Sequence, residues 1–165
     1  MSRRKHIVAV IGAGSCDPGM ARTASEVGRL LAGAGHVVLT GGLRGVMEAA
    51  SQGAREAGGL VIGLLPGAST QDANPHVDVP IATGVGEGRN VIIANTADAF
   101  VAVGGGYGTL TEIAFAIQRG KCVVCLGSWE AGLPVRKAQT PEEAVEILSA
   151  ELAALDSAAS PPEPA

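Results

Sequence analysis

Short apolar runs alternate with helix-patterned segments along nearly all of this 165-residue chain. Each run is continuously apolar instead of alternating with polar residues, which is typical of strands covered on both faces. Such strands form a parallel sheet between two layers of helices, joined by right-handed crossovers. The sequence therefore predicts an α/β fold: a single-domain, Rossmann-like, doubly wound and mostly parallel sheet with helices on both faces.

Turn and capping residues indicate where these segments begin and end. The predicted strands cover residues 5–11, 37–40, 60–65, 77–81, 98–103 and 121–126, and the fourth has the weakest pattern. The predicted helices cover 18–34, 46–57, 89–96, 109–119 and a last segment from residue 141. Asp17 and Thr140 are the expected N-caps of the first and last helices, and Glu143 completes a capping box with Thr140.

The last helix is expected to close the domain. Its buried stripe is predicted to consist of Val145, Leu148, Leu152 and Leu155. Small, polar and proline-rich residues follow it, which predicts a disordered tail. The expected domain therefore covers residues 1–156 and the tail covers 157–165.

Composition and charge narrow the classes of partner. A net charge of −4 and an aromatic content of 2% disfavour a general nucleic-acid binder, which needs basic surface and stacking platforms. No apolar stretch approaches the ~20 residues that span a bilayer, so no membrane partner is expected. The apolar run after the basic residues 3–5 is too short for a secretory signal peptide. We therefore expect a cytoplasmic protein with a small-molecule ligand.

The most specific motif is a glycine-rich loop between the predicted strand 98–103 and the helix after it. It consists of Gly104, Gly105, Gly106, Tyr107, Gly108 and Thr109. Glycines let the backbone approach a ligand with no side chain in the way. Bare N–H groups and the positive end of the helix dipole hold an anion, most often phosphate. The loop therefore predicts a site for a phosphorylated small molecule.

Two further glycine loops follow predicted strands, and loops at the carboxyl ends of parallel strands gather at one edge of the sheet. Their candidate binding residues are Gly12, Gly14, Gly41, Gly42 and Gly45. A dinucleotide fingerprint starting at Gly12 would need glycine where Asp17 stands, and no acid ends the second strand. A nicotinamide cofactor is therefore not expected. Cys16, in the first loop, either lines the site or fills the turn.

Arg89 and Glu112 are the candidates for chemistry beside the phosphate loop. Glu112 follows Thr109 by three residues and shares its helical face, so it would face the part of the ligand beyond the phosphate. A carboxylate beside a ribose stabilises an oxocarbenium-like transition state, whereas the alternative role is that of a first-turn acid favoured by the helix dipole. Arg89 either binds phosphate or lies in solvent.

The histidines and cysteines form no ligand or nucleophile pattern. His6, His36 and His76 are scattered, so no metal site is expected. Cys122 and Cys125 stand three apart on a predicted strand and so point to opposite faces. Neither a shared metal ion nor a disulfide between them is expected.

Residues 104–112 read GGGYGTLTE, and Arg89 stands in the predicted helix before them. This resembles the Lonely-guy (LOG) family, whose motif is PGGxGTxxE and whose catalytic pair is an upstream arginine and the last glutamate. The resemblance covers roughly residues 5–150. It implies hydrolysis of the N-glycosidic bond of nucleoside 5′-monophosphates, such as AMP or cytokinin riboside monophosphates, by Arg89 and Glu112. It also implies no required cofactor and a homo-oligomer, a dimer or larger.

Three positions depart from that family pattern. Gly104 replaces a proline, Asn90 replaces a lysine, and Thr111 replaces a frequent acid. These features resemble a sister subgroup that includes the molybdenum-cofactor carrier proteins, which carry a pterin phosphate without cleaving it. The resemblance thus implies either a non-catalytic carrier of the molybdenum cofactor, which is favoured, or a phosphoribohydrolase. A DNA-processing protein of related fold is disfavoured by the charge and the scarce aromatic residues.

Overall fold

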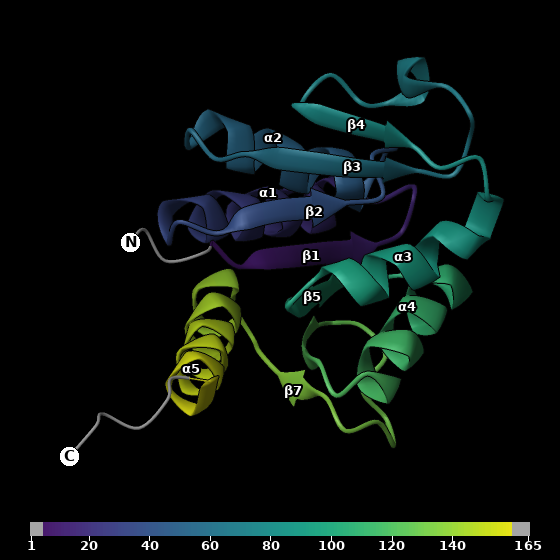
Figure 1. Ribbon diagram of the computed structural model, residues 1–165. Coiled ribbons are helices and arrows are strands. Elements are labelled where there is room, and N and C mark those ends of the chain that lie inside the picture. Colours follow the sequence, from purple (N-terminus) through teal and green to yellow (C-terminus); the bar gives the residue numbers. More distant parts are fainter. Residues whose placement is uncertain (1–4, 160–165) are drawn as a thin grey trace.

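A computed structural model describes residues 5–159. The fold is built on one seven-stranded sheet with the strand order β4-β3-β2-β1-β5-β6-β7 (Figure 1). All neighbouring strands are parallel. The strands are β1 (Ile7–Gly12), β2 (Val37–Thr40), β3 (Val61–Leu65), β4 (Val79–Ala82), β5 (Ala99–Val103), β6 (Cys122–Leu126) and β7 (Arg136–Lys137). The predicted parallel α/β sheet is confirmed.

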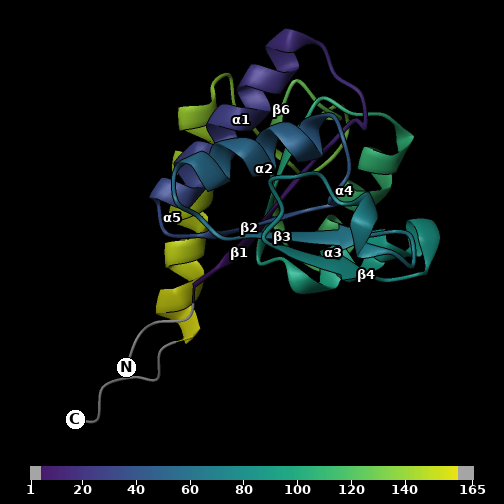
Figure 2. The same ribbon diagram turned by 90° about the horizontal axis from the view of Figure 1, so that it is seen from above.

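Helices cover both faces of the sheet. They are α1 (Pro18–Gly33), α2 (Val46–Glu56), α3 (Arg89–Thr96), α4 (Tyr107–Gln118) and α5 (Pro141–Ala159), with short 3-10 turns at Thr70–Asp72 and Gly86–Gly88. Helices α1, α2 and α5 lie on one face, and α3 and α4 lie on the other (Figure 2). Each face packs its own apolar cluster against the continuously apolar strands, as the sequence pattern requires.

Helix α1 shows how local sequence sets this packing. The Asp17 side chain accepts a hydrogen bond from the Met20 backbone N at 2.9 Å, so the predicted N-cap is confirmed. Two glycines allow α1 and α2 to touch: a Cβ on Gly28 would lie 2.0 Å from the Ala50 carbonyl oxygen, and one on Gly53 would lie 1.9 Å from that of Ser25. This contact fixes the layer behind β1 and β2.

The structure differs from the sequence prediction at several segment ends. Strand β7 was not predicted, and α4 begins at Tyr107, two residues earlier than expected. Leu155 is 56% exposed and does not belong to the buried stripe of α5. Helix α5 continues through Ala159, so the first residues of the predicted tail are helical; residues 160–165 lie outside the described part of the chain.

Cys122 and Cys125 point to opposite faces of β6, as predicted. Cys125 belongs to the cluster under α3 and α4, whereas Cys122 packs against the cluster under α1, α2 and α5. Burial raises the pKa of both thiols, that of Cys125 to about 11. Both therefore stay protonated at neutral pH.

Within residues 5–159, no helix is both long and apolar enough to cross a membrane.

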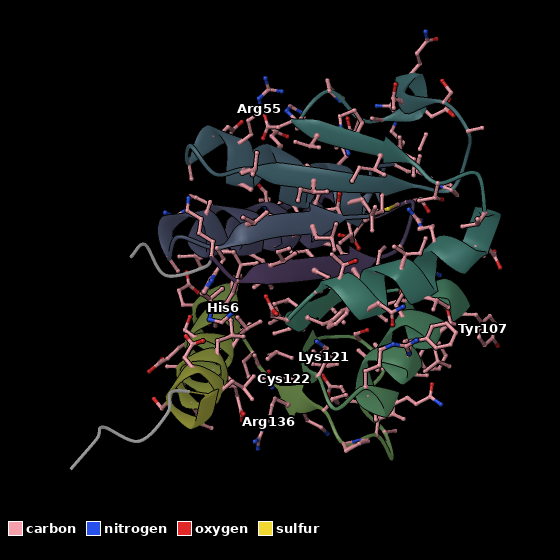
Figure 3. The ribbon with its side chains drawn as sticks, in the orientation of Figure 1. His6, Arg55, Tyr107, Lys121, Cys122 and Arg136 are labelled. Carbon is pink, nitrogen blue, oxygen red and sulfur yellow. The ribbon has the colours of Figure 1, made fainter. Side chains whose placement is uncertain are left out.

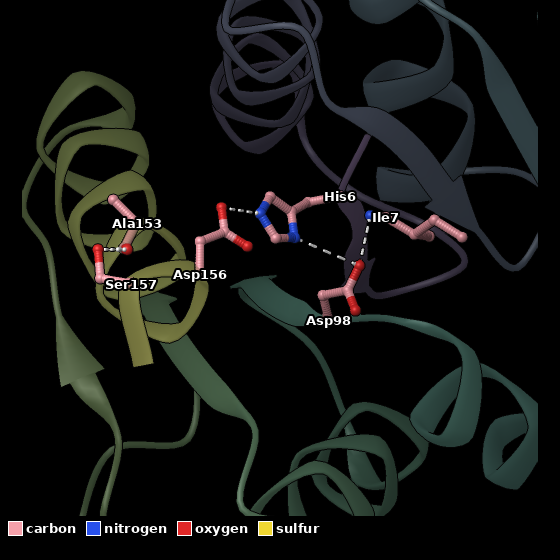
Figure 4. Close-up of polar contacts among 6 residues, drawn as sticks. All are labelled: His6, Ile7, Asp98, Ala153, Asp156 and Ser157. Carbon is pink, nitrogen blue, oxygen red and sulfur yellow. Dashed lines mark hydrogen bonds and ion pairs between the residues drawn. The ribbon is translucent and has the colours of Figure 1, made fainter. Parts of the chain in front are cut away.

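His6, which directly precedes β1, joins α5 to the sheet (Figure 4). Its Nε2 lies 2.9 Å from Oδ2 of Asp156 on α5, and its Nδ1 lies 3.6 Å from Oδ2 of Asp98. The same Asp98 oxygen accepts a hydrogen bond from the Ile7 backbone N at 2.9 Å. One imidazole thus connects α5 with the starts of β1 and β5.

We expect His6→Ala to lower the free energy of unfolding by about 1–2 kcal/mol, because a partly buried hydrogen bond between α5 and the sheet is lost. Urea unfolding at pH 7 measures the difference. His76→Ala is the control, since the His76 imidazole makes no hydrogen bond within residues 5–159. Equal losses in the two variants would contradict a specific role for His6.

Candidate functional site

A cavity of about 460 Å³ opens at the carboxyl ends of β1, β2, β3 and β5. All three predicted glycine loops reach it. Of the predicted site residues, its wall contains Gly12, Gly14, Gly41, Arg89, Gly106, Gly108, Thr109 and Glu112. Segments far apart in the sequence therefore meet where ligands of open parallel sheets bind, and the volume suits a nucleotide or a pterin.

The other predicted binding residues shape the loops without lining the cavity. Gly42 is buried against β3, Gly45 caps the start of α2, and Gly104 packs against Met20. Tyr107 is 80% exposed and points outward at the start of α4 (Figure 3). Cys16 is half-buried, packs against the cluster under α1, and does not line the cavity.

The backbone of the third loop presents a run of free donors. Within residues 5–159, the N–H groups from Gly105 to Thr109 have no hydrogen-bond acceptor, and the first helical bond of α4 runs from the Leu110 N to the Gly106 O. Gly106, the N-cap residue, provides no side-chain cap. Unsatisfied N–H groups and the positive end of the α4 dipole together favour an anion.

Glu112 lies one helical turn from Thr109, and both side chains are buried at the cavity wall. Glu112 is 8% exposed, and its carboxyl group makes no hydrogen bond within the described residues. Burial raises the Glu112 pKa to about 7, and the nearby Arg89 charge offsets part of that rise. A nearly buried carboxyl group without a protein partner is suited to contact a ligand.

Arg89 is held by backbone carbonyls. Its Nη1 donates to the Gly41 oxygen at 2.5 Å and to the Leu64 oxygen at 2.6 Å, and its Nε donates to Asn90 Oδ1 at 3.0 Å. Burial lowers the Arg89 pKa, and the charge of Glu112 counteracts this. The guanidinium thus braces the ends of β2 and β3 while keeping positive charge at the cavity.

Asn90 and Thr111, two of the departures from the Lonely-guy pattern, lie next to each other. The Asn90 Nδ2 is 3.5 Å from the Thr111 Oγ1, which donates to the Gly108 carbonyl at 2.6 Å. Where that pattern has a lysine and an acid, this chain has a neutral pair. This contact was not predicted from the sequence, in which the two positions lie 21 residues apart.

Sequence reasoning also missed Ser128 and Trp129, which follow β6. The Ser128 hydroxyl donates to the Gly104 carbonyl at 2.5 Å, and the Trp129 Nε1 donates to the Gly106 carbonyl at 3.0 Å. Their position in the sequence could have indicated this contact, because they follow β6, the strand next to β5 in the sheet. Loops after adjacent parallel strands meet at the same edge of the sheet.

Comparison with known proteins places this geometry in context. The chain matches the SLOG cluster4 family over residues 5–155. It is similar to the molybdenum cofactor binding protein of the phototrophic bacterium Rippkaea orientalis, with 38% identity and a TM-score of 0.86 over 92% of this chain and 99% of that one. The Moco carrier protein of Chlamydomonas reinhardtii gives 40% identity and a TM-score of 0.83, with the same coverage of 92% and 99%.

A third relative comes from an archaeon. An uncharacterized protein of Archaeoglobus fulgidus is 49% identical over 138 residues, which are 84% of this chain and 91% of that protein. The solved structures confirm the predicted single-domain, Rossmann-like fold. The family shown by the match is SLOG cluster4, and the narrower Lonely-guy assignment stays a prediction.

Proposed function

The chain belongs to the SLOG cluster4 family, and from that premise we propose that it binds a phosphorylated pterin or nucleotide without cleaving it, as a carrier of the molybdenum-cofactor type. Two similar solved structures are described as a molybdenum cofactor binding protein and a Moco carrier protein. The molybdenum cofactor is then the cargo of the protein, and its phosphate is the group held by the third loop.

One observation carries this proposal: the N–H groups of Gly105 to Thr109 have no acceptor within the described residues, and this loop borders the cavity. Phosphate oxygens satisfy such donors at a helix N-terminus. The buried carboxyl group of Glu112 then faces the next part of the ligand, where ring or sugar groups can donate hydrogen bonds to it. The donors present thus fit a phosphate attached to a polar ring system.

The neutral pair Asn90–Thr111 favours binding over turnover. In the Lonely-guy pattern a lysine follows the arginine and supplies a second positive charge. Here Asn90 is directed to Arg89 and Thr111. Among residues 5–159, Arg89 is the only cation at the cavity wall. Less charge is available to stabilise a leaving group, whereas the free N–H groups for binding are retained.

Hydrolysis of nucleoside 5′-monophosphates is the second candidate, and Glu112 favours it. A carboxyl group with a pKa of about 7 exchanges protons readily near neutral pH, as a general acid or base must. In this mechanism Glu112 acts on the glycosidic bond of a nucleotide whose phosphate lies on the loop. Arg89 orients the sugar phosphate.

Two ligands separate the candidates. The protein is titrated by calorimetry with AMP and with neopterin phosphate, a stable phosphorylated pterin, and the AMP mixture is then analysed by chromatography for adenine. The carrier proposal expects binding of the phosphorylated pterin and no adenine. Adenine release that Glu112→Gln abolishes would establish the hydrolase instead, and failure of both ligands to bind would overturn both candidates.

A further inference from the structure

We infer that Ser128 and Trp129 are positioning residues that aim the N–H groups of the third glycine loop into the cavity. This inference rests on the proposed function, because it assigns how the same loop is held ready for an anion. The two residues lie in the segment between β6 and β7 and touch the loop through its carbonyl groups.

The two hydrogen bonds act on alternate peptide groups. Ser128 holds the carbonyl of Gly104, and Trp129 adds a second hydrogen bond to the carbonyl of Gly106, which also accepts the first helical bond of α4. In a trans peptide the C=O and the following N–H point in opposite directions. Fixing these carbonyls toward the β6–β7 segment therefore turns the N–H groups of Gly105 and Tyr107 away from that segment.

The main cavity borders the same loop. Ser128, Trp129 and Gly105 line a separate hollow of about 600 Å³ behind the loop, and neither Ser128 nor Trp129 lines the main cavity. Gly106 and Gly108 form the cavity wall on the other side. The loop thus borders two spaces: Gly105 lines the hollow beside Ser128 and Trp129, whereas Gly106, Gly108 and Thr109 line the cavity that the free N–H groups are inferred to face.

The anchor residues are themselves held in place. The Cys125 thiol lies 3.7 Å from the Trp129 carbonyl oxygen, and the Trp129 ring lies 5.8 Å from that of Tyr107, centre to centre. Glycines at φ +55° (Gly104) and φ +108° (Gly105) leave the loop backbone with many alternative conformations. Side-chain anchors remove that freedom before the ligand arrives, which is how preorganisation increases affinity.

Trp129 also supplies a direct optical readout, since the chain contains one tryptophan. Pterins absorb in the range where tryptophan emits, so neopterin phosphate bound at the adjacent loop quenches Trp129 by energy transfer. The quenching reports that the pterin is bound next to the loop. A variant that merely loses stability, but still folds, leaves the bound-state quenching unchanged.

The test uses Trp129→Phe and Ser128→Ala in the full chain, titrated with neopterin phosphate by calorimetry. Each substitution removes one donor, and we expect each to weaken binding about fivefold to tenfold, the equivalent of one hydrogen bond. Ser128→Thr keeps the hydroxyl and should restore most of the affinity. Glu130→Gln is the matched control, because Glu130 lies in the same segment and pairs with Lys137 at 3.5 Å without contacting the loop.

The outcomes distinguish this inference from the proposed function. Weaker binding in both variants, with rescue by Ser128→Thr, supports the inference. Unchanged affinity in folded Trp129→Phe and Ser128→Ala overturns it while leaving the proposed function intact. If the wild-type protein binds neither neopterin phosphate nor AMP, the proposed function fails and the inference fails with it.

Discussion

At pH 8 the Glu112→Gln variant is expected to exceed the wild-type protein in free energy of unfolding by about 3 kcal/mol. Burial of the carboxyl group disfavours its charged form and raises its pKa from 4.5 to about 7. Each pKa unit corresponds to about 1.4 kcal/mol. Glutamine has nearly the same shape as the protonated acid and carries no charge that must be desolvated.

The pH dependence follows from proton counting. Between pH 4.5 and 7 the folded chain keeps the Glu112 proton and the unfolded chain has lost it, so rising pH destabilises the folded state through this group. Below pH 4.5 the Glu112 carboxyl group is protonated in both the folded and the unfolded state, so its burial does not lower the free energy of unfolding. The stability advantage of glutamine should therefore be small at pH 4.5 and complete above pH 7.

Urea unfolding of both proteins at pH 4.5 and pH 8 measures this difference. Glu146→Gln is the control, because Glu146 is exposed on α5. An advantage of Glu112→Gln that is equal at the two pH values would show that the carboxyl group does not titrate as its burial implies. A loss of stability at pH 8 would show that its attraction to Arg89 outweighs the cost of burial.

A destabilising group at a cavity wall indicates function, because packing alone would favour a neutral residue at position 112. The protonated carboxyl group can donate a hydrogen bond, and the ionised one accepts two. Both forms are accessible near neutral pH. In the proposed carrier this property would let Glu112 hold a polar ring, and in the alternative hydrolase it would let Glu112 transfer a proton.

Most of the fold could be predicted because it depends on local pattern. Continuous apolar runs predicted β1, β2, β3, β5 and β6, and the Asp17 cap predicted the start of α1. Strand β7 escaped because it consists of two exposed cations, Arg136 and Lys137, at the sheet edge, with no apolar side chain to reveal it. The exposure of Leu155 also depends on where the sheet ends, which periodicity does not encode.

The meeting of the three glycine loops at one cavity could be predicted from the sequence, whereas the side-chain contacts around that cavity could not. The three loops were found because glycines between a strand and a helix have few other uses. The carbonyl anchors of Arg89 join it to Gly41 and Leu64, which are far away in the sequence and carry no distinctive residue type. The hydrogen bonds of Ser128 and Trp129 to the loop also run from a side chain to a backbone carbonyl far away in the sequence.

Gly105→Ala and Gly108→Ala are expected to have opposite effects on stability and the same effect on binding. At Gly105 the backbone has φ +108°, and an added Cβ would lie 2.3 Å from the Thr109 Oγ1 and 2.5 Å from the Thr109 Cβ. Strained backbone and overpacking together should cost about 2–4 kcal/mol. Since Thr109 lines the cavity, its displacement should also abolish ligand binding.

At Gly108 the fold has no need of glycine. An added Cβ meets no atom within 4 Å, and the position lies in the first turn of α4. Alanine favours the helix over glycine by up to about 1 kcal/mol, so the variant should be at least as stable as the wild type. A helical Cβ leans toward the helix N-terminus, which here is the proposed anion site. The methyl group should therefore weaken binding of neopterin phosphate at least tenfold.

Urea unfolding measures the stability of the two variants, and calorimetric titration measures their affinity for neopterin phosphate. Glycine stands at position 108 either because the chain needs it to fold or because the ligand needs its space. The first explanation requires Gly108→Ala to lose stability, and the second requires it to lose affinity alone. A stable Gly108→Ala variant that binds neopterin phosphate as the wild type does would place the ligand away from the α4 N-terminus, and the loop would then be a structural turn only.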